Sequence, residues 1–423
     1  MNPDEIKRQM MLLWKKTFHD TDEYVNLIFD NYYSLDRIEY HEIDGKIVSA
    51  LMEVPYNFGW KNHQLIGMYL CGLMTDQQYR RHGIMQMLLE RTVEKVKKAG
   101  YAFCFLIPAN KGLVKYYSVN GYSNAFYRVV NRYTELHDFR HEYNTFVMNN
   151  NERTGELKMK FYDSLWFEKI ILSDNNISNN VIDFIYDKEN NSEFIVMRHS
   201  RKDIELFLRE NYLSNNSSYI VKDKEDKITA VAVTENDDNV TSVLHIYAAD
   251  LCSKMRILDG IRLDGDGRAL LLYEYPEASH RTALWSRSYV AGSDTSLVSL
   301  VTQTSERVYN VAAHANPYGM VQFVDISAVL SLLADWKREM KINLLVREVR
   351  DNVGCYFQID RGKCVDRSVS GIEFERLEKD SSVLTLTAYQ LQEILCRRPD
   401  ADRLIMEAFG LPRLGLDMCL LLD

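Results

Sequence analysis

The chain has 423 residues, of which 46% are hydrophobic and 26% charged, an ordinary composition for a folded globular protein. This length exceeds what one hydrophobic core supports, so we expect two or three domains. The formal net charge of −9 argues against nucleic acid as a partner. No apolar run approaches the ~20 residues that span a bilayer, and the amino terminus lacks a signal-peptide core. These features predict a cytoplasmic protein with no membrane partner.

The first part of the chain alternates between helical and strand patterns. An acidic segment starts the second helix, and Asp44-Gly45 between apolar runs is typical of a hairpin. The expected elements are helices over 1–18 and from 20 to 33, a hairpin over 38–55, a buried strand over 64–74, an amphipathic helix over 81–98 and an apolar strand over 101–107. The last three elements predict a right-handed parallel crossover.

Beyond about residue 149 the composition becomes rich in asparagine, which indicates an interdomain connection. The stretch from about 140 to 310 predicts short strands and one helix near 202–212, without a glycine-anchored strand–turn–helix. The elements expected after Pro317 are a strand over 320–324, a helix over 326–340, a hairpin over 342–349 and 353–359, helices over 387–397 and 400–409, and an apolar tail over 418–423.

A basic, glycine-containing turn connects the buried strand at 64–74 to the amphipathic helix. Arg80, Arg81 and His82 supply positive charge, and Gly83 allows a bulky anion to approach the backbone closely. Unpaired N–H groups at a helix start attract the same kind of charge. We therefore expect a pyrophosphate site, with a purely structural turn as the alternative.

A second polar element follows the next apolar strand. A loop at Pro108-Ala109-Asn110 leads to a short tyrosine-led helix that ends at Gly121. A tyrosine with its ordinary pKa of about 10 can protonate a leaving thiolate whose pKa is about 8.5. Tyr117 is thus a candidate general acid, and an ordinary amphipathic tyrosine is the alternative.

Together, the two elements resemble the GCN5-related N-acetyltransferase (GNAT) superfamily. The match is carried by Arg80-x-x-Gly83 after a buried strand and by Tyr117-x-x-x-Gly121-Tyr122 after the following strand. The turn in that superfamily is written Gln/Arg-x-x-Gly-x-Gly/Ala. Here Met85 stands at the position of the small residue, which is a departure at the pyrophosphate turn.

The resemblance extends to the Eis-type (enhanced intracellular survival) acetyltransferases. It is carried by TFHDTDEY at 17–24, YRRHGIMQML at 79–88, MVQFVD at 320–325 and INLLVREVRDNVGCYFQIDRGKC at 342–364. It implies an α/β (α+β) fold with three domains, which are a GNAT domain over 1–138, a degenerate GNAT-like domain over 139–312 and a sterol carrier protein-like domain over 313–423. It also implies a homo-oligomer, a trimer or a hexamer.

This resemblance implies acetyl-CoA as the cosubstrate, no metal, and direct attack of an amine on the thioester. The backbone at the end of the strand would bind the pantetheine arm, and the turn and helix start would bind the pyrophosphate. The implied cofactor-binding residues are Leu73, Met74, Thr75, Arg80, Arg81, His82, Gly83, Ile84, Met85 and Asn110. Tyr117 would be the general acid and the main-chain carboxylate of Asp423 the base. A terminal strand with a solvated end is the alternative role of that chain end.

An amine acceptor calls for an acidic and aromatic pocket. The candidates in the first domain are Asp22, Glu23, Tyr33 and Trp60, with Asp20 and Tyr32 beside them. Each of them could instead be a helix cap, a solvated charge or part of the core. The resemblance suggests a polyamine, an aminoglycoside or a lysine side chain as the acceptor.

Two other functions remain open at this point. The first is a non-catalytic protein that senses acyl-CoA and carries an apolar ligand in its last domain. The second is an aminoacyl or peptidyl transferase, which the acidic charge disfavours. The seven cysteines form no CxxC pair and predict reduced thiols. His137 with His141 predicts surface histidines, and residues 264–267 predict a hairpin turn, so neither predicts a metal site.

Overall fold

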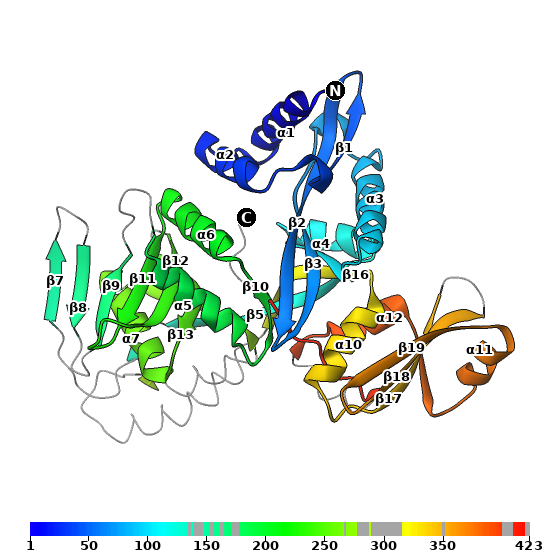
Figure 1. Cartoon of the computed structure of the whole chain (residues 1–423). Coiled ribbons are helices and arrows are strands. Elements are labelled where there is room, and N and C mark those ends of the chain that lie inside the picture. Colours follow the sequence, from blue (N-terminus) through cyan, green and yellow to red (C-terminus); the bar gives the residue numbers. More distant parts are fainter. Residues whose placement is uncertain are drawn as a thin grey trace.

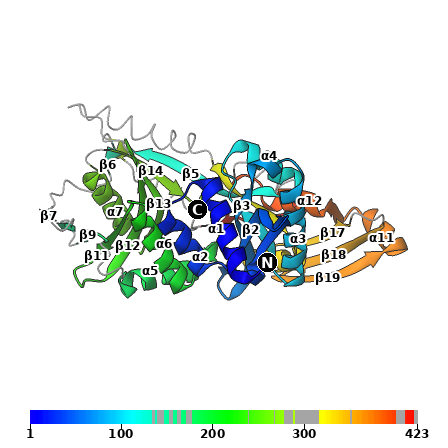
Figure 2. The ribbon, with the colours of Figure 1, turned by 90° about the horizontal axis from the view of Figure 1, so that it is seen from above.

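The computed structural model describes residues 1–133, 137–138, 147–151, 156–160, 165–170, 177–237, 239–265, 268–276, 287–288, 315–348, 352–399 and 409–418. Their elements form three groups that lie in a row, with the amino-terminal group in the centre (Figure 1 and Figure 2). We call the elements of residues 1–133 the first unit, those of 137–288 the middle unit and those of 326–399 the last unit. Within these described ranges no helix is both long and apolar enough to cross a membrane.

The first unit contains helices on both faces of a mixed sheet. Its elements are α1 (Pro3–Phe18), α2 (Asp22–Asn31), η1 (Leu35–Arg37), β1 (Ile38–Ile43), β2 (Lys46–Trp60), β3 (His63–Thr75), η2 (Gln77–Tyr79), α3 (Ile84–Lys98), β4 (Phe103–Leu106), α4 (Lys111–Val119) and β5 (Ser123–Tyr133). The elements expected from the sequence in this part are confirmed, with bounds that differ by a few residues. The parallel pairing of β3 with β4 confirms the predicted parallel crossover.

The middle unit has more regular structure than its sequence predicts. Its elements are β6 (His137–Asp138), β7 (Val147–Asn151), β8 (Glu156–Lys160), β9 (Trp166–Lys169), α5 (Asn179–Asn190), β10 (Ile195–Arg198), α6 (Arg201–Leu213), β11 (Ser217–Lys222), β12 (Ile228–Asn236), β13 (Val240–Ala248), α7 (Leu251–Asp264), β14 (Ala269–Glu274) and β15 (Arg287–Ser288). The segment expected to connect domains contains β7, which pairs with β8. The expected hairpin turn at 264–267 is wrong at its first residue, because Asp264 ends helix α7; positions 266 and 267 lie outside the described residues.

The remaining elements include a small separate sheet. They are β16 (Ala315–Phe323), α10 (Ile326–Trp336), β17 (Ile342–Arg347), β18 (Val353–Asp360), β19 (Lys363–Ser370), α11 (Gly371–Glu378), β20 (Val383–Thr387), α12 (Ala388–Leu395) and β21 (Leu416–Asp417). The small sheet has the order β19-β18-β17-β20. The hairpin predicted over 342–359 is its centre. The helix predicted over 400–409 lies outside the described residues except at its end.

A fifteen-stranded sheet connects the first and middle units in the part of the chain described. Its central order is β3-β4-β16-β5-β14-β13. The outer pairs, β3 with β4 and β13 with β14, are parallel, and the three pairs between them are antiparallel. The pattern of parallel and antiparallel pairs is therefore the same when it is read from either end of these six strands. β16 thus lies in the sheet between two strands of the first unit, whereas the sequence groups it with the last unit.

The two faces of this sheet have separate cores. In β4, Cys104 and Leu106 pack under α3 and α4, while Phe103 and Phe105 pack toward the last unit. Such alternation is what a strand buried on both faces requires. The face opposite α3 is also covered by α1 and α2, whose apolar sides pack together with α5 and α6 of the middle unit. The first unit is therefore enclosed on one face by elements from all three groups.

Candidate active site

Strands β3 and β4 part in the centre of the first unit. They pair over Gly67–Tyr69 and Phe103–Phe105, but β3 continues to Thr75 while β4 ends at Leu106. Beyond Tyr69, this edge of β3 has no strand partner among the described residues. Backbone N–H and C=O groups there can bond to an extended ligand, as they would to another strand. The structure thus brings Leu73, Met74 and Thr75 to an open sheet edge.

A bulge shapes this open edge of β3. The register with β2 shifts between Ala50 and Met52, and Gly72 lies opposite this shift with a φ of 58°. A Cβ atom at Gly72 would lie 2.2 Å from a ring carbon of Trp14. The Trp14 Nε1–H donates to Asp20 Oδ2 at 2.7 Å, so the ring is fixed from its other side. Both the backbone conformation and the nearby indole ring therefore favour glycine at this bulge.

The start of α3 is an uncapped helix terminus. Gly83, at φ 76°, precedes the helix, no side chain caps it, and a Cβ at Gly83 would have nothing within 4 Å. Arg81 also has a left-handed conformation, with φ 67°, which is why the helix begins at Ile84 and not at Arg81 as the sequence predicts. Arg80, Arg81 and His82 are exposed. The unpaired N–H groups of α3 and these basic side chains together suit a diphosphate.

Asp76 anchors the segment between β3 and α3. Its carboxylate contacts Lys16 Nζ at 2.9 Å and Lys46 Nζ at 3.2 Å, and it accepts a hydrogen bond from the Gln78 N–H. The Asp76 N–H donates to the Val48 carbonyl. The hydrogen bond from Lys16, followed by that from Lys46, lowers the pKa of Asp76 to about 2. The turn is therefore held to α1 and to β2 by one buried carboxylate, a residue that the sequence does not single out.

Asp76→Asn should lower the free energy of unfolding by about 1 kcal/mol at pH 7, because both lysines are largely exposed and their pairs with Asp76 are screened. The folded pKa lies below the ordinary value of 3.8, so this stabilisation is complete above about pH 4 and disappears toward about pH 2. Urea unfolding at pH 7 and at about pH 3 measures the difference. An equal difference between wild type and variant at both pH values would contradict the ionic role of Asp76.

Three hydrogen bonds fix the end of β3 before the turn. Arg80 Nε donates to the Thr75 carbonyl at 3.0 Å, and the Ser49 hydroxyl bonds to the Met74 carbonyl and to the Thr75 hydroxyl. Arg80 thus closes the turn onto the strand, while Arg81 and His82 have no such backbone contact among the described residues. This separates the predicted basic residues into one that shapes the turn and two that are available to an anion.

Tyr117 lies on the α4 side of the open edge. It is buried in the same apolar cluster as Leu73 of β3 and Met85 of α3. Its ring contacts Tyr116 and Tyr122, and its hydroxyl has no hydrogen-bond partner among the described residues. Burial raises the pKa of Tyr117, so the hydroxyl keeps its proton at neutral pH. The structure therefore brings the predicted acid, the strand end and the start of α3 into one cluster.

Three other predicted cofactor residues are partly buried or have structural roles. Met85 turns into the apolar cluster under α3, so its side chain packs inward. Ile84 is half-buried at the start of the same helix. Asn110 caps α4, where its Oδ1 accepts from the Leu113 N–H at 3.1 Å. The helix-cap role of Asn110 positions Tyr117, which lies two turns farther along α4.

The predicted acceptor residues of the first unit are not brought together. Asp22 forms an ion pair with Lys15 at 2.6 Å, and Glu23 is exposed beside it in the first turn of α2. Tyr33 stacks on Phe29 and faces α1. Trp60 lies at the hairpin end of β2, the opposite end from the turn at Asp76, under the ammonium group of Lys61.

A cavity between the first and middle units lies next to the end of β4. It has a volume of about 280 Å³, and Ile107, which follows β4, is part of its wall. The other residues that line it are Arg128, Phe207, Glu210, Asn211, Asn216, Glu235, Leu244, His245, Tyr318 and Met418. They come from segments far apart in the sequence, so no local pattern could have indicated them. Glu210 and Glu235 give this cavity the acidic groups expected of an amine site.

The described carboxyl end of the chain reaches this cavity. Met418 is the last residue described before the terminus, and it lines the wall. Its carbonyl accepts a hydrogen bond from the Tyr318 hydroxyl and another from the Arg128 guanidinium, and Arg128 also lies over the Tyr318 ring. Asp423, the predicted base, lies outside the described residues.

Comparisons with known proteins identify a family model that matches the first unit. Residues 2–125 match the family model described as an acetyltransferase (GNAT) domain. No curated protein matches the sequence. Among solved structures, a protein of Enterococcus faecalis V583 described as a probable N-acyltransferase is similar at 12% identity and a TM-score of 0.64, over 99% of this chain and 97% of the other.

Two further structures are similar over nearly the whole length. A GCN5-related N-acetyltransferase from Kribbella flavida has 13% identity and a TM-score of 0.62, over 99% of this chain and 96% of its own. Eis1 from Mycobacterium abscessus has 11% identity and a TM-score of 0.60, over 97% of this chain and 92% of its own. At such identities these likenesses show a shared fold over nearly the whole chain.

Proposed function

Because residues 2–125 match the GNAT acetyltransferase domain model, we propose that this chain is a GNAT enzyme that transfers the acetyl group of acetyl-CoA to a primary amine. One observation carries the proposal. The uncapped start of α3, the open edge of β3 and the buried Tyr117 hydroxyl surround one place in the fold. The start of α3 suits a diphosphate, the open edge of β3 suits an extended thioester arm, and the Tyr117 hydroxyl suits a leaving thiolate.

The proposed binding mode follows from which backbone groups are free. The N–H groups from Arg81 to Met85 bind the pyrophosphate, with Arg81 and His82 adding charge. Gly83 leaves room for this because no atom occupies the position of its absent side chain. The backbone of Leu73 and Met74 bonds the pantetheine arm and polarises the thioester carbonyl, since the bulge leaves Leu73 without a Cα partner in β2 next to the open edge.

The proposed reaction needs one acid and one base. The amine nitrogen attacks the thioester carbonyl, the N–C bond forms, and the C–S bond breaks as the tetrahedral intermediate collapses. Tyr117 gives its proton to the departing sulfur, because a tyrosine hydroxyl that stays protonated at neutral pH can neutralise a thiolate. The nitrogen must lose a proton, and the main-chain carboxylate of Asp423 is the proposed acceptor of that proton.

We place the amine acceptor in the cavity between the first and middle units. It lies beside Ile107, next to the point where β3 and β4 part, and it contains the carboxylates of Glu210 and Glu235. Met418 in its wall brings the end of the described chain toward this cavity, which supports the proposed role of the terminus. An acceptor with more than one ammonium group, such as a polyamine, an aminoglycoside or a lysine-rich segment, suits such a wall.

The experiment compares two glycines at opposite ends of α3. Gly83 and Gly100 are both exposed, both left-handed at φ 76° and 78°, and neither has an atom within 4 Å of its absent Cβ. Gly83→Ala and Gly100→Ala should therefore destabilise the chain equally, by about 1 kcal/mol. Only Gly83→Ala should weaken binding of coenzyme A, by about tenfold or more, as measured by isothermal titration calorimetry.

Turnover completes this test. The wild-type chain should release free thiol from acetyl-CoA when a panel of amines is supplied, and Gly100→Ala should do so at the wild-type rate. Equal loss of coenzyme A affinity in both variants would contradict the proposed pyrophosphate site at the start of α3. Tight coenzyme A binding without turnover on any amine would instead favour a sensor of acyl-CoA.

A further inference from the structure

The middle unit contains its own opening between parallel strands. β13 and β14 pair over Val240–Val243 and Ala269–Leu272, after which both strands continue unpaired with each other. A cavity of about 290 Å³ lies in this opening, lined by residues 244–248 of β13 and 273–275 at the end of β14. Because the pattern of parallel and antiparallel pairs in the central strands is the same from either end, this cavity has the position in the middle unit that the open edge of β3 has in the first.

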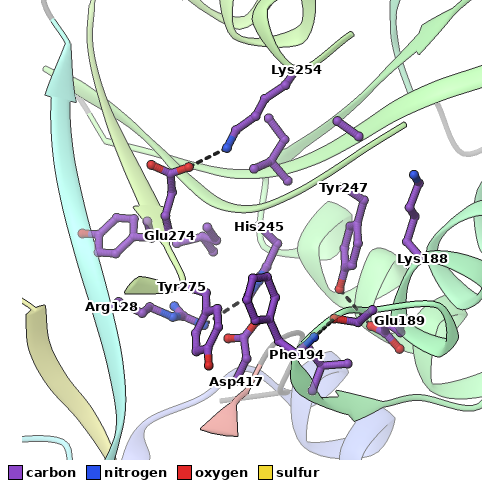
Figure 3. A pocket seen from close by; sticks show the side chains of 16 residues that line it. Arg128, Lys188, Glu189, Phe194, His245, Tyr247, Lys254, Glu274, Tyr275 and Asp417 are labelled. Atoms are coloured by element: carbon purple, nitrogen blue, oxygen red, sulfur yellow. Dashed lines mark hydrogen bonds and ion pairs between the residues drawn. The ribbon is translucent and has the colours of Figure 1, made fainter. Parts of the chain in front are cut away.

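The cavity cannot hold a nucleotide diphosphate in the way proposed for the first unit. Helix α7 follows β13 as α3 follows β3, but Asp250 caps it, with Oδ1 accepting from the Ser253 N–H at 2.8 Å. A carboxylate therefore occupies the start of this helix, where an anion would have to bind. The connection between β13 and α7 also contains no glycine. Lys254 of α7 and Glu274 of β14, which both line the cavity, form an ion pair at 2.5 Å (Figure 3).

Most charged groups in the wall have partners of their own. Glu189 is buried and accepts hydrogen bonds from the Tyr247 hydroxyl at 2.8 Å and from the His199 N–H at 2.9 Å. Arg128 contacts His245 Nε2 at 3.3 Å and the Met418 carbonyl. These buried polar groups therefore have hydrogen-bond partners inside the protein without a ligand.

Two opposite charges in the wall remain without an ion pair among the described residues. Lys188 of α5 lies over the ring of Phe184, with the charge of Asp250 nearby, and Asp417 of β21 has a hydrogen bond with the Met418 backbone and the charge of Arg128 nearby. Burial is the largest effect on each group, because it lowers the pKa of Lys188 and raises the pKa of Asp417 to about 6, and the nearby charges of Asp250 and Arg128 offset these shifts only in part. Figure 3 shows Asp417 on the side of Phe194 and Tyr275, and Lys188 on the side of Tyr247.

Aromatic rings form the wall next to Asp417. Phe194 and Tyr275 meet edge to face at 5.0 Å, and the Tyr275 hydroxyl donates to the Gly415 carbonyl at 2.6 Å, which fixes its ring. Rigid rings beside a carboxylate favour an ammonium group with an apolar body. We propose that this cavity binds a small zwitterion, an amino acid whose ammonium group pairs with Asp417 and whose carboxylate pairs with Lys188.

The cavity shares part of its wall with the proposed acceptor cavity. Arg128, Leu244 and His245 line both of them. Asp417 also immediately precedes Met418, which lines only the acceptor side. An amino acid bound here thus contacts the residues that separate the two cavities, and it lies outside the reacting centre.

The test uses the full chain without acetyl-CoA and four probes with the same number of carbons. L-Norleucine and 6-aminohexanoate are zwitterionic isomers, hexylamine lacks the carboxylate and hexanoate lacks the ammonium group. Isothermal titration calorimetry should show that at least one zwitterion binds about tenfold or more tightly than hexylamine and hexanoate. Each of these two singly charged probes can pair with only one of the two charged side chains. Asp417→Asn should weaken the zwitterion in the same way.

Lys188→Gln is the decisive variant because Lys188 is half-buried on a helix and its replacement leaves the core intact. It should reduce the affinity for the zwitterion about tenfold and leave hexylamine unchanged. Lys202→Gln, an exposed lysine of α6 outside the cavity, is the matched control and should change neither affinity. Failure of both zwitterions to bind, affinity equal to that of hexylamine, or an unchanged affinity in Lys188→Gln would each overturn the proposal.

Discussion

Tyr117→Phe should lower kcat by about a hundredfold or more while the affinity for acetyl-CoA changes little. The hydroxyl has no hydrogen-bond partner among the described residues, so its removal breaks no structural contact, and the ring contacts with Tyr116 and Tyr122 are kept. What the variant loses is the proton for the leaving sulfur. Steady-state release of thiol, with acetyl-CoA affinity measured separately, distinguishes the chemical step from binding.

The matched control for this substitution is Tyr116→Phe, the neighbouring tyrosine on α4, whose ring is half-exposed. It should leave kcat near the wild-type value. Since burial raises the pKa of Tyr117, the wild-type rate should also show no decline from loss of this proton below about pH 10. A Tyr117→Phe variant that turns over at the wild-type rate would rule out this residue as the acid.

Gly72→Ala should be the most destabilising change near the site, by about 2–4 kcal/mol. Alanine is strained at a φ of 58°, and its Cβ would meet the Trp14 ring at 2.2 Å. That ring cannot easily move, because it bonds to Asp20 and packs edge to face on Phe29 at 5.7 Å. Relief of the clash would have to shift α1 or flatten the bulge in β3.

Urea unfolding of Gly72→Ala is compared with that of Gly45→Ala. Gly45 lies in the turn between β1 and β2 at φ 77°, with no atom within 4 Å of its absent Cβ. The control therefore contains the backbone strain without the clash, and should cost only about 1–2 kcal/mol. If both variants lose the same stability, the contact with Trp14 contributes nothing and the bulge depends on backbone conformation alone.

The sequence predicts the first unit well because its signals are local. The period of α3, the Asp44-Gly45 turn and the doubly apolar strands each depend on neighbouring residues, and the structure has them where they are expected. The basic turn and the tyrosine helix could be recognised for the same reason. The sequence predicts that this helix starts at residue 81, whereas α3 starts at Ile84. The difference arises because Arg81 and Gly83 have left-handed backbone conformations, which the helical period of the sequence does not reveal.

The cavities could not be predicted in the same way. Each wall combines strands, helices and the carboxyl end of the chain, so it depends on the tertiary arrangement of the units. Arg128 is an ordinary arginine in a strand pattern, and its contacts with His245 and the Met418 carbonyl link residues far apart along the chain. Likewise, Asp76 gives no signal in the sequence, because its lysine partners come from α1 and from β2.

The position of β16 has a consequence for how the protein is made. The gap between β4 and β5 is filled only by residues 315–323, and β5 in turn supplies the neighbour of β14. During synthesis, we therefore expect the edges of β4 and β5 to lack a strand partner until residues 315–323 have left the ribosome. Because β16 pairs with both β4 and β5, we expect the amino-terminal sheet to be completed only together with the later part of the chain.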